Sequence, residues 1–263
     1  MAEQEKKIVA IHQPHYFPWL GYFDKMAKVD RFVVMDQVQF VPRSYMSRNS
    51  FVDKNGEIVR LSLSVSKTGH REKELKEIET LNCPIWQNKH ALFLKDSYQY
   101  MPYYKEVMNE IGNIFEKPYT KLIDVQMDTI TSICRMLNIS TELVFQSNLT
   151  IMPSIVSDDN LTEEEKKRQR RCLDVIHICI AAEATHYITG RGKSLEFVDP
   201  KLFEQHHIEL AMQDYTCPKY PQRHTKEFVP NISALDFLFN CGIEEARHIF
   251  WKNVHSTREF HCE

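Results

Sequence analysis

Two histidines and an amide follow directly after the first apolar run of the chain. Residues 8–11 are apolar and mostly β-branched, and His12, Gln13 and His15 come immediately behind them. An imidazole can take or give a proton during a reaction, and a side-chain amide can donate a hydrogen bond to a developing oxyanion. We therefore predict that His12 is the catalytic acid or base and that Gln13 is an oxyanion donor. His15 and the nearby Trp19 are predicted to contact substrate.

A carboxylate ends the second apolar run. Residues 31–36 finish in Asp36, and an amphipathic stretch over residues 20–29 separates the two runs. Strand, helix and strand over about thirty residues form a βαβ unit, and ligands of open α/β sheets gather at the carboxyl ends of the strands. Asp36 is therefore expected to share one rim with His12, where it would orient the imidazole, accept from a substrate amine or hold Mg²⁺.

A donor-rich stretch follows this unit. Gln39, Arg43, Arg48 and Asn49 lie close together in sequence, and the planar fork of arginine suits a carboxylate or a diphosphate. We predict substrate contact for all four residues, with Asn49 also a donor to the oxyanion. Lys67, which lies in a later loop, is predicted to neutralise phosphate.

The second half of the chain holds the remaining candidates. Residues 190–194 read Gly-Arg-Gly-Lys-Ser, and backbone amides of such a loop can cradle a phosphate. His224 is a second candidate for proton transfer. The predicted substrate contacts in this half are Gly190, Ser194, Tyr215, Gln222 and Asn231.

The order of apolar and amphipathic segments predicts an α/β fold, with a mostly parallel sheet flanked by helices and one inserted β-hairpin. Asn55-Gly56 between alternating residues is a strong hairpin signal. We expect one domain over residues 1–263. The predicted sheet strands are 8–11, 31–36, 142–145, 186–189 and 209–213; the hairpin strands are 50–53 and 57–65; the helices are 20–29, two within 84–115, 119–137, one from about 157–160 to 184, 200–206, 233–239 and 243–251.

Composition excludes several classes of protein. The formal charge of -3 gives no electrostatic case for nucleic acid as the main partner. The seven cysteines are scattered, so neither a disulfide framework nor a structural zinc site is indicated. No stretch has the apolar length of a signal peptide or a spanning helix. A cytoplasmic protein that does not act at a membrane is the expectation.

Three stretches of the chain together resemble one family. They are IHQPHYFPWLGYFDK (11–25), DQVQF with Arg43, Arg48 and Asn49 behind it, and YPQRH with FVPNISALDFLFNCG (220–242). They resemble the WbqC-like protein family, and the resemblance runs from residue 8 to about 242. It implies a role in O-antigen or other surface-glycan biosynthesis, in which an amino acid, glycine foremost, is attached to the amine of a dTDP- or UDP-linked amino sugar.

The resemblance leaves the form of the aminoacyl donor, the oligomeric state and two alternative functions open. The implied cofactor is ATP or another activated form of the aminoacyl donor, and a homodimer is one candidate for the oligomeric state. This chain carries His15 where the family usually has Asn, and Thr225-Lys226 where it tends to have Gly. Two other functions remain as alternatives: a non-catalytic protein that binds a sugar nucleotide, and a metal-dependent hydrolase or deacetylase that uses His12 and His15.

Overall fold

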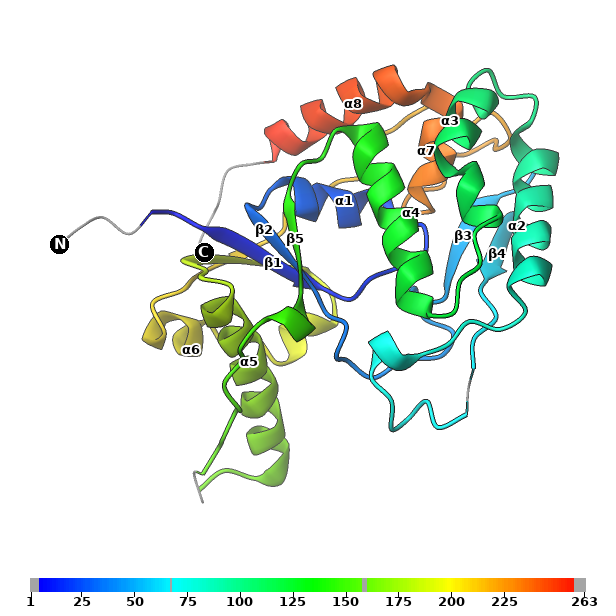
Figure 1. Ribbon diagram of the computed structural model, residues 1–263. Helices are drawn as coiled ribbons and strands as arrows, with labels where there is room; N and C mark the ends of the chain where they lie inside the picture. Colours follow the sequence, from blue (N-terminus) through cyan, green and yellow to red (C-terminus); the bar gives the residue numbers. More distant parts are fainter. Residues whose placement is uncertain (1–4, 67, 158–159, 258–263) are drawn as a thin grey trace.

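The computed structural model describes residues 5–66, 68–157 and 160–257, and its centre is a five-stranded parallel sheet (Figure 1). The strands lie in the order β5-β2-β1-β6-β7. Their bounds are β1 (Ile8–His12), β2 (Arg31–Val34), β5 (Glu142–Phe145), β6 (His186–Thr189) and β7 (Glu209–Met212). The predicted α/β fold class is confirmed.

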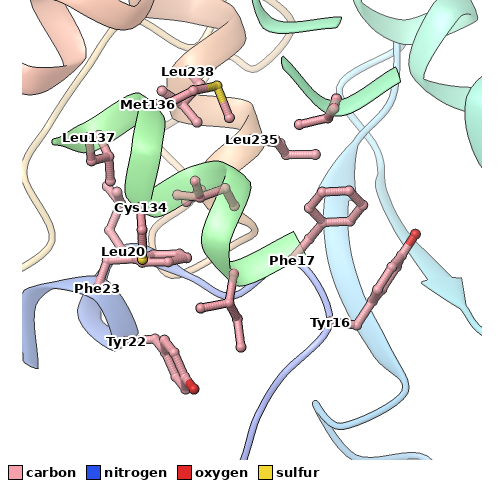
Figure 2. Close-up of a cluster of buried hydrophobic side chains, with 14 of the residues drawn as sticks. Tyr16, Phe17, Leu20, Tyr22, Phe23, Cys134, Met136, Leu137, Leu235 and Leu238 are labelled. Carbon is pink, nitrogen blue, oxygen red and sulfur yellow. The ribbon is translucent and has the colours of Figure 1, made fainter. Parts of the chain in front are cut away.

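Both faces of this sheet are buried, which explains why its strands are apolar without alternation. Val9 and Ile11 pack against α5 (Glu163–Ala181) and the region of α6 (Pro200–Gln205), while Ala10 faces the larger core on the other side. That larger core lies under α1 (Leu20–Ala27), α4 (Leu122–Leu137), α7 (Ala234–Cys241) and α8 (Ile243–Ser256). Figure 2 shows part of it, with side chains of α1, α4 and α7 packed together.

The strand order reverses direction beside β1. The chain first builds outward from β1 to β2 and then β5, and it returns through α5 to add β6 and β7 on the other side of β1. Such a reversal opens a crevice at the carboxyl ends of the strands, where open α/β sheets bind ligands. In this sheet the crevice lies where β1 and β6 end.

The hairpin forms a separate antiparallel sheet of β3 (Arg48–Val52) and β4 (Ile58–Ser62). Its strands are shifted from the predicted ranges because Asp53 leaves the ladder, and its side chain accepts from the backbone amides of Asn55 and Glu57 in the turn. Gly56 completes the turn at a φ of 85°, a conformation that glycine adopts without steric cost.

The remaining helices confirm the predicted elements and correct some ends. The region 84–115 holds α2 (Cys83–Tyr98), α3 (Tyr104–Ile111) and a 3-10 turn (Gly112–Phe115). Helix α5 begins at Glu163, later than predicted, because Thr162 and Glu165 form a reciprocal capping box. Helix α4 begins at Leu122 rather than residue 119. None of the helices in the described residues is long and apolar enough to cross a membrane.

Candidate active site

The predicted rim exists, and its centre is the end of β1. His12 is the last residue of the strand and is partly buried, and Gln13 follows it. The Nδ1 atom of His12 lies 2.9 Å from the backbone carbonyl oxygen of Gln13. Because a carbonyl can only accept, Nδ1 carries the proton in this contact, and Nε2 keeps its lone pair for another partner.

The rings of His15 and Tyr22 pack against His12. The centroid of the His12 ring lies 4.8 Å from that of His15 and 5.0 Å from that of Tyr22. His15 Nδ1 and the Tyr22 hydroxyl are both buried and have no hydrogen-bond partner among the described residues. Unpaired buried polar atoms are rare in folded proteins. Their occurrence together at the mouth of a switch-point crevice is typical of a site that receives a polar ligand.

Both imidazoles are neutral at neutral pH. Burial holds the pKa of His12 well below its ordinary value, and the charge of Lys25 adds to this effect. Burial, followed by the charge of Lys25, lowers the pKa of His15 to about 3. The two rings therefore act as hydrogen-bonding groups rather than as cations.

Lys25 is a functional candidate that the sequence analysis missed. It lies on α1 and is only 5% exposed, and its amine has no hydrogen bond or ion pair with any described residue. Helix side chains lean toward the helix N-terminus, which directs this amine to the rim. A Cβ atom at Gly190, directly after β6, would lie 3.1 Å from Lys25 Nζ, so the amine reaches the end of β6.

A pocket lined by arginines lies between the hairpin and the loop before it. Arg43, Arg48 and Arg60 line a cavity of about 140 Å³ together with Tyr45, and no acidic side chain is among the lining residues. Arg43 and Arg48 also line an adjacent cavity of about 420 Å³. None of the three guanidinium groups is paired with a described carboxylate. Three guanidinium groups without carboxylate partners give this cavity a positive charge, which suits an anion.

Tyr45 joins this pocket to the histidines. Its ring stacks on His15 with centroids 5.4 Å apart and an interplanar angle of 28°, and it is 50% exposed. A ligand held by the arginines would therefore pass over an aromatic surface before it reached His15. A larger cavity of about 460 Å³ lies between α3 and α8 and contains none of these residues.

Comparison with known proteins assigns the family. A sequence profile of the WbqC-like protein family matches residues 13–248. The chain belongs to the WbqC-like protein family. A WbqC-like relative from Mycobacterium tuberculosis (strain ATCC 25618 / H37Rv), "Uncharacterized protein Rv1507c", is 28% identical over 239 residues, which cover 90% of this chain and 95% of that protein. No solved structure matches the chain.

Asp36 of this WbqC-like protein lies on the same rim as His12, as predicted, because Val34 pairs with His12 in register and the amide of Met35 donates to the carbonyl of His12. Asp36 is 3% exposed, and its two carboxylate oxygens accept from the backbone amide and the hydroxyl of Ser147, at 2.9 and 2.6 Å. Both oxygens are therefore engaged in holding the loop after β5. The predicted roles in orienting His12 or accepting from an amine have no support in this geometry.

Two members of the donor-rich stretch also have structural contacts. Asn49 is 2% exposed, and its amide nitrogen donates to the backbone carbonyls of Tyr16 and Phe17, so it is not free to stabilise an oxyanion. The side chain of Gln39 donates to the carbonyl of Arg71 at 3.0 Å. The predicted phosphate contact of Lys67 lies outside the described residues.

The C-terminal WbqC-like motif is held together by a buried carboxylate. Asp236 accepts from the hydroxyls of Tyr98 and Tyr220 and from the side chain of Gln222. Gln222 is therefore part of the frame of the motif. Asn231 is exposed in a turn at a φ of 60° and makes no described side-chain hydrogen bond.

His224 lies with the hairpin and α2 rather than with His12. Its Nε2 lies 2.7 Å from the carbonyl oxygen of Ser97, its ring contacts Tyr98, and its own carbonyl lies against Gly56. None of these contacts is with the rim. The prediction that His224 is a second catalytic base at the same site is not supported by its position.

The other predicted contacts lie around the rim or behind it. Ser194 donates to the carbonyl of Gly190 and accepts from Thr189, so its hydroxyl holds the loop together. Trp19 covers Gly21 of α1, and Tyr215 packs edge-on to Trp19 at 5.2 Å. Within the described residues, no group of three His, Cys, Asp or Glu side chains could hold a metal ion, so the metal-dependent alternative lacks a complete ligand set there.

Proposed function

We propose that this protein transfers an aminoacyl group, glycyl in the first instance, to the amine of a nucleotide-linked amino sugar, forming an amide for a surface polysaccharide such as O-antigen. The observation that carries the proposal is the contact of Tyr45 with both parts of the site. Tyr45 lines the arginine pocket and stacks on His15. An anion site and an uncharged polar site therefore adjoin.

The two parts suit the two ends of the proposed substrate. The diphosphate would lie against Arg43, Arg48 and Arg60, whose positive charge is not matched by acidic residues of the pocket. The sugar would lie across Tyr45, since aromatic faces pack well against sugar rings and bases. The amine would then reach the rim at His12.

The rim meets the chemical needs of amide formation. The attacking nitrogen must lose a proton, and the carbonyl oxygen of the donor develops negative charge. Neutral His12 offers the lone pair of Nε2 as a hydrogen-bond acceptor, and the side chain of Gln13 makes no described hydrogen bond and is free to donate. The proposed oxyanion donor is therefore Gln13 alone, because Asn49 is engaged elsewhere.

The test supplies the protein with dTDP- and UDP-amino sugars and with glycine in three forms: with ATP, as a thioester, and as glycyl-tRNA. Mass spectrometry should detect the gain of one glycyl residue on at least one sugar nucleotide. Binding of the sugar nucleotide without product in any arm would favour the non-catalytic binding protein. If the protein neither binds a sugar nucleotide nor forms product, the proposal is refuted.

The arginine pocket supplies a sharper test. Arg60→Met should raise KM about tenfold or more with little change in kcat, because a charge-assisted hydrogen bond contributes about 1.5–3 kcal/mol. Arg171→Met is the matched control, since Arg171 is exposed on α5 and lines neither cavity. Equal KM values for the two variants would remove the diphosphate from this pocket.

A further inference from the structure

Lys25 has the position of a reacting group rather than of a structural one. Every residue of α1 is buried, including Asp24 and Lys25, which lie next to each other in sequence. Buried lysines are ordinarily paired with a carboxylate. Lys25 is not paired, although a carboxylate is its neighbour in the chain.

The neighbouring carboxylate is bound elsewhere. Asp24 Oδ2 accepts from Lys28 at 3.0 Å and from the side chain of Gln213 at 2.8 Å. Consecutive residues of a helix point in directions about 100° apart, so Asp24 faces β7 and Lys28 while Lys25 faces the ends of β1 and β6. The same helix thus carries one buried lysine that is neutralised and one that is not.

The surroundings of Lys25 favour its uncharged form. From β1 and the loop after it, the groups that interact with Lys25 are His12 and His15, and neither supplies a negative charge. From the loop after β6, Gly190 lies against the amine, and the next residue, Arg191, is directed toward Asp214. Burial lowers the pKa of Lys25 to about 8, and the charge of Asp24 opposes this shift.

We propose that Lys25 is the proton acceptor of this site and that its neutral amine takes the proton from the amino-sugar nitrogen as that nitrogen attacks the acyl carbon. This inference rests on the function proposed above. His12 is poorly suited to the role, because a base whose pKa lies far below the working pH holds a proton weakly. His12 would instead accept a hydrogen bond from the attacking amine and position it.

The nitrogen lone pair of the neutral sugar amine forms the N–C bond, and the carbonyl π pair moves to oxygen. The nitrogen then gives its proton to Lys25, which becomes an ammonium. The oxygen lone pair then re-forms the carbonyl, and the bond to the leaving group of the activated donor breaks. The leaving group either takes the proton from Lys25 or departs as an anion. In the second case, solvent removes the proton from Lys25.

The first arm of the test needs no substrate. Protein carrying lysine labelled with ¹³C at Cε is titrated by NMR, and Lys25→Arg identifies the Lys25 signal. That signal should titrate near pH 8. Titration of Lys25 above pH 10 would overturn the inference, whether or not any substrate has been found.

The second arm uses turnover of whichever sugar nucleotide gains a glycyl group. Lys25→Met and Lys25→Arg should both lower kcat/KM by about a hundredfold or more, and the wild-type profile should rise through pH 8. Lys201→Met should leave turnover unchanged. Recovery of activity in Lys25→Arg would show that Lys25 serves as a cation and not as a base. Absence of turnover in wild type with every donor would end the proposed function. The NMR titration would then still show whether the pKa of Lys25 is lowered to about 8.

Discussion

The buried carboxylate of the C-terminal motif supports a prediction that does not depend on any substrate. Asp236 is 2% exposed and accepts three hydrogen bonds, from Tyr98 at 2.9 Å, Tyr220 at 2.9 Å and Gln222 at 3.0 Å. Asp236→Leu removes both carboxylate oxygens, and so the acceptor of all three hydrogen bonds. Gln222 keeps the carbonyl of Val229 and the Tyr220 oxygen as partners, so the two tyrosine hydroxyls are the donors left unpaired.

The expected magnitude follows from that count. A buried donor left unpaired costs about 1–3 kcal/mol, so the free energy of unfolding of Asp236→Leu should fall by about 2–6 kcal/mol. Asp236→Asn should cost less, about 1–3 kcal/mol. Its amide oxygen can accept from Tyr220 and Gln222, but its amide nitrogen is a donor, so the Tyr98 hydroxyl proton alone loses its acceptor.

The contribution of Asp236 to stability depends on pH. Burial raises the pKa of Asp236 despite the hydrogen bonds to its carboxylate. A carboxyl whose pKa is higher in the folded state contributes stability at low pH and loses that contribution as pH rises through the folded pKa. Because asparagine does not titrate, the stability of wild type relative to Asp236→Asn should fall as pH rises from the acid range.

Urea unfolding followed by circular dichroism measures these differences. Asp96→Leu is the control, because Asp96 is exposed on α2 and should change stability by about 0.5 kcal/mol or less. Equal unfolding midpoints for Asp236→Leu and Asp236→Asn would refute the account of Asp236 as the acceptor that holds the motif. The role of the motif in substrate binding would then have to be considered again.

Two further predictions concern backbone and charge. Gly56→Ala should lower the free energy of unfolding by about 2 kcal/mol or more, because Gly56 has a φ of 85° and a Cβ atom there would collide with the carbonyl oxygen of His224. Thermal melts measure the difference. The control is Gly112→Ala, which has open space around the new Cβ and should be neutral or stabilising. Lys28→Met should cost about 3–5 kcal/mol because it leaves Asp24 buried without its cation, and Asp24→Asn in the same chain should restore part of the loss in urea unfolding. A double variant no more stable than Lys28→Met would contradict that explanation.

The sequence predicted the strands of the sheet well because each strand is marked by its own short run of apolar residues. The runs at residues 142–145 and 186–189 coincide with β5 and β6, and β1 and β2 differ from the predicted ranges only at their ends. Each is a short apolar segment followed by polar residues, and burial on both faces of a parallel sheet requires that pattern. The start of α5 differs from the prediction because the capping box of Thr162 and Glu165 begins the helix, and the polar residues 157–160 precede it.

The roles of the site residues depend on contacts that the sequence does not display. Asp36 is bound by Ser147, which is 111 positions away, and His224 by Ser97, which is 127 positions away. Lys25 follows an aspartate on an amphipathic helix, a pattern usual for a solvated face. Only the packing of α1 beneath the ends of β1 and β6 reveals that this side chain is buried and that its amine is unpaired.

Asn49 ties the hairpin to the rim more closely than an insertion would require. Its side-chain amide holds the carbonyls of Tyr16 and Phe17, and these two residues directly follow His15. Trimming the hairpin to a simple turn would therefore release the segment that carries the histidines, even though no hairpin residue needs to touch the reacting atoms. Engineered versions with a shortened hairpin would need a replacement donor at this point to keep His15 in place.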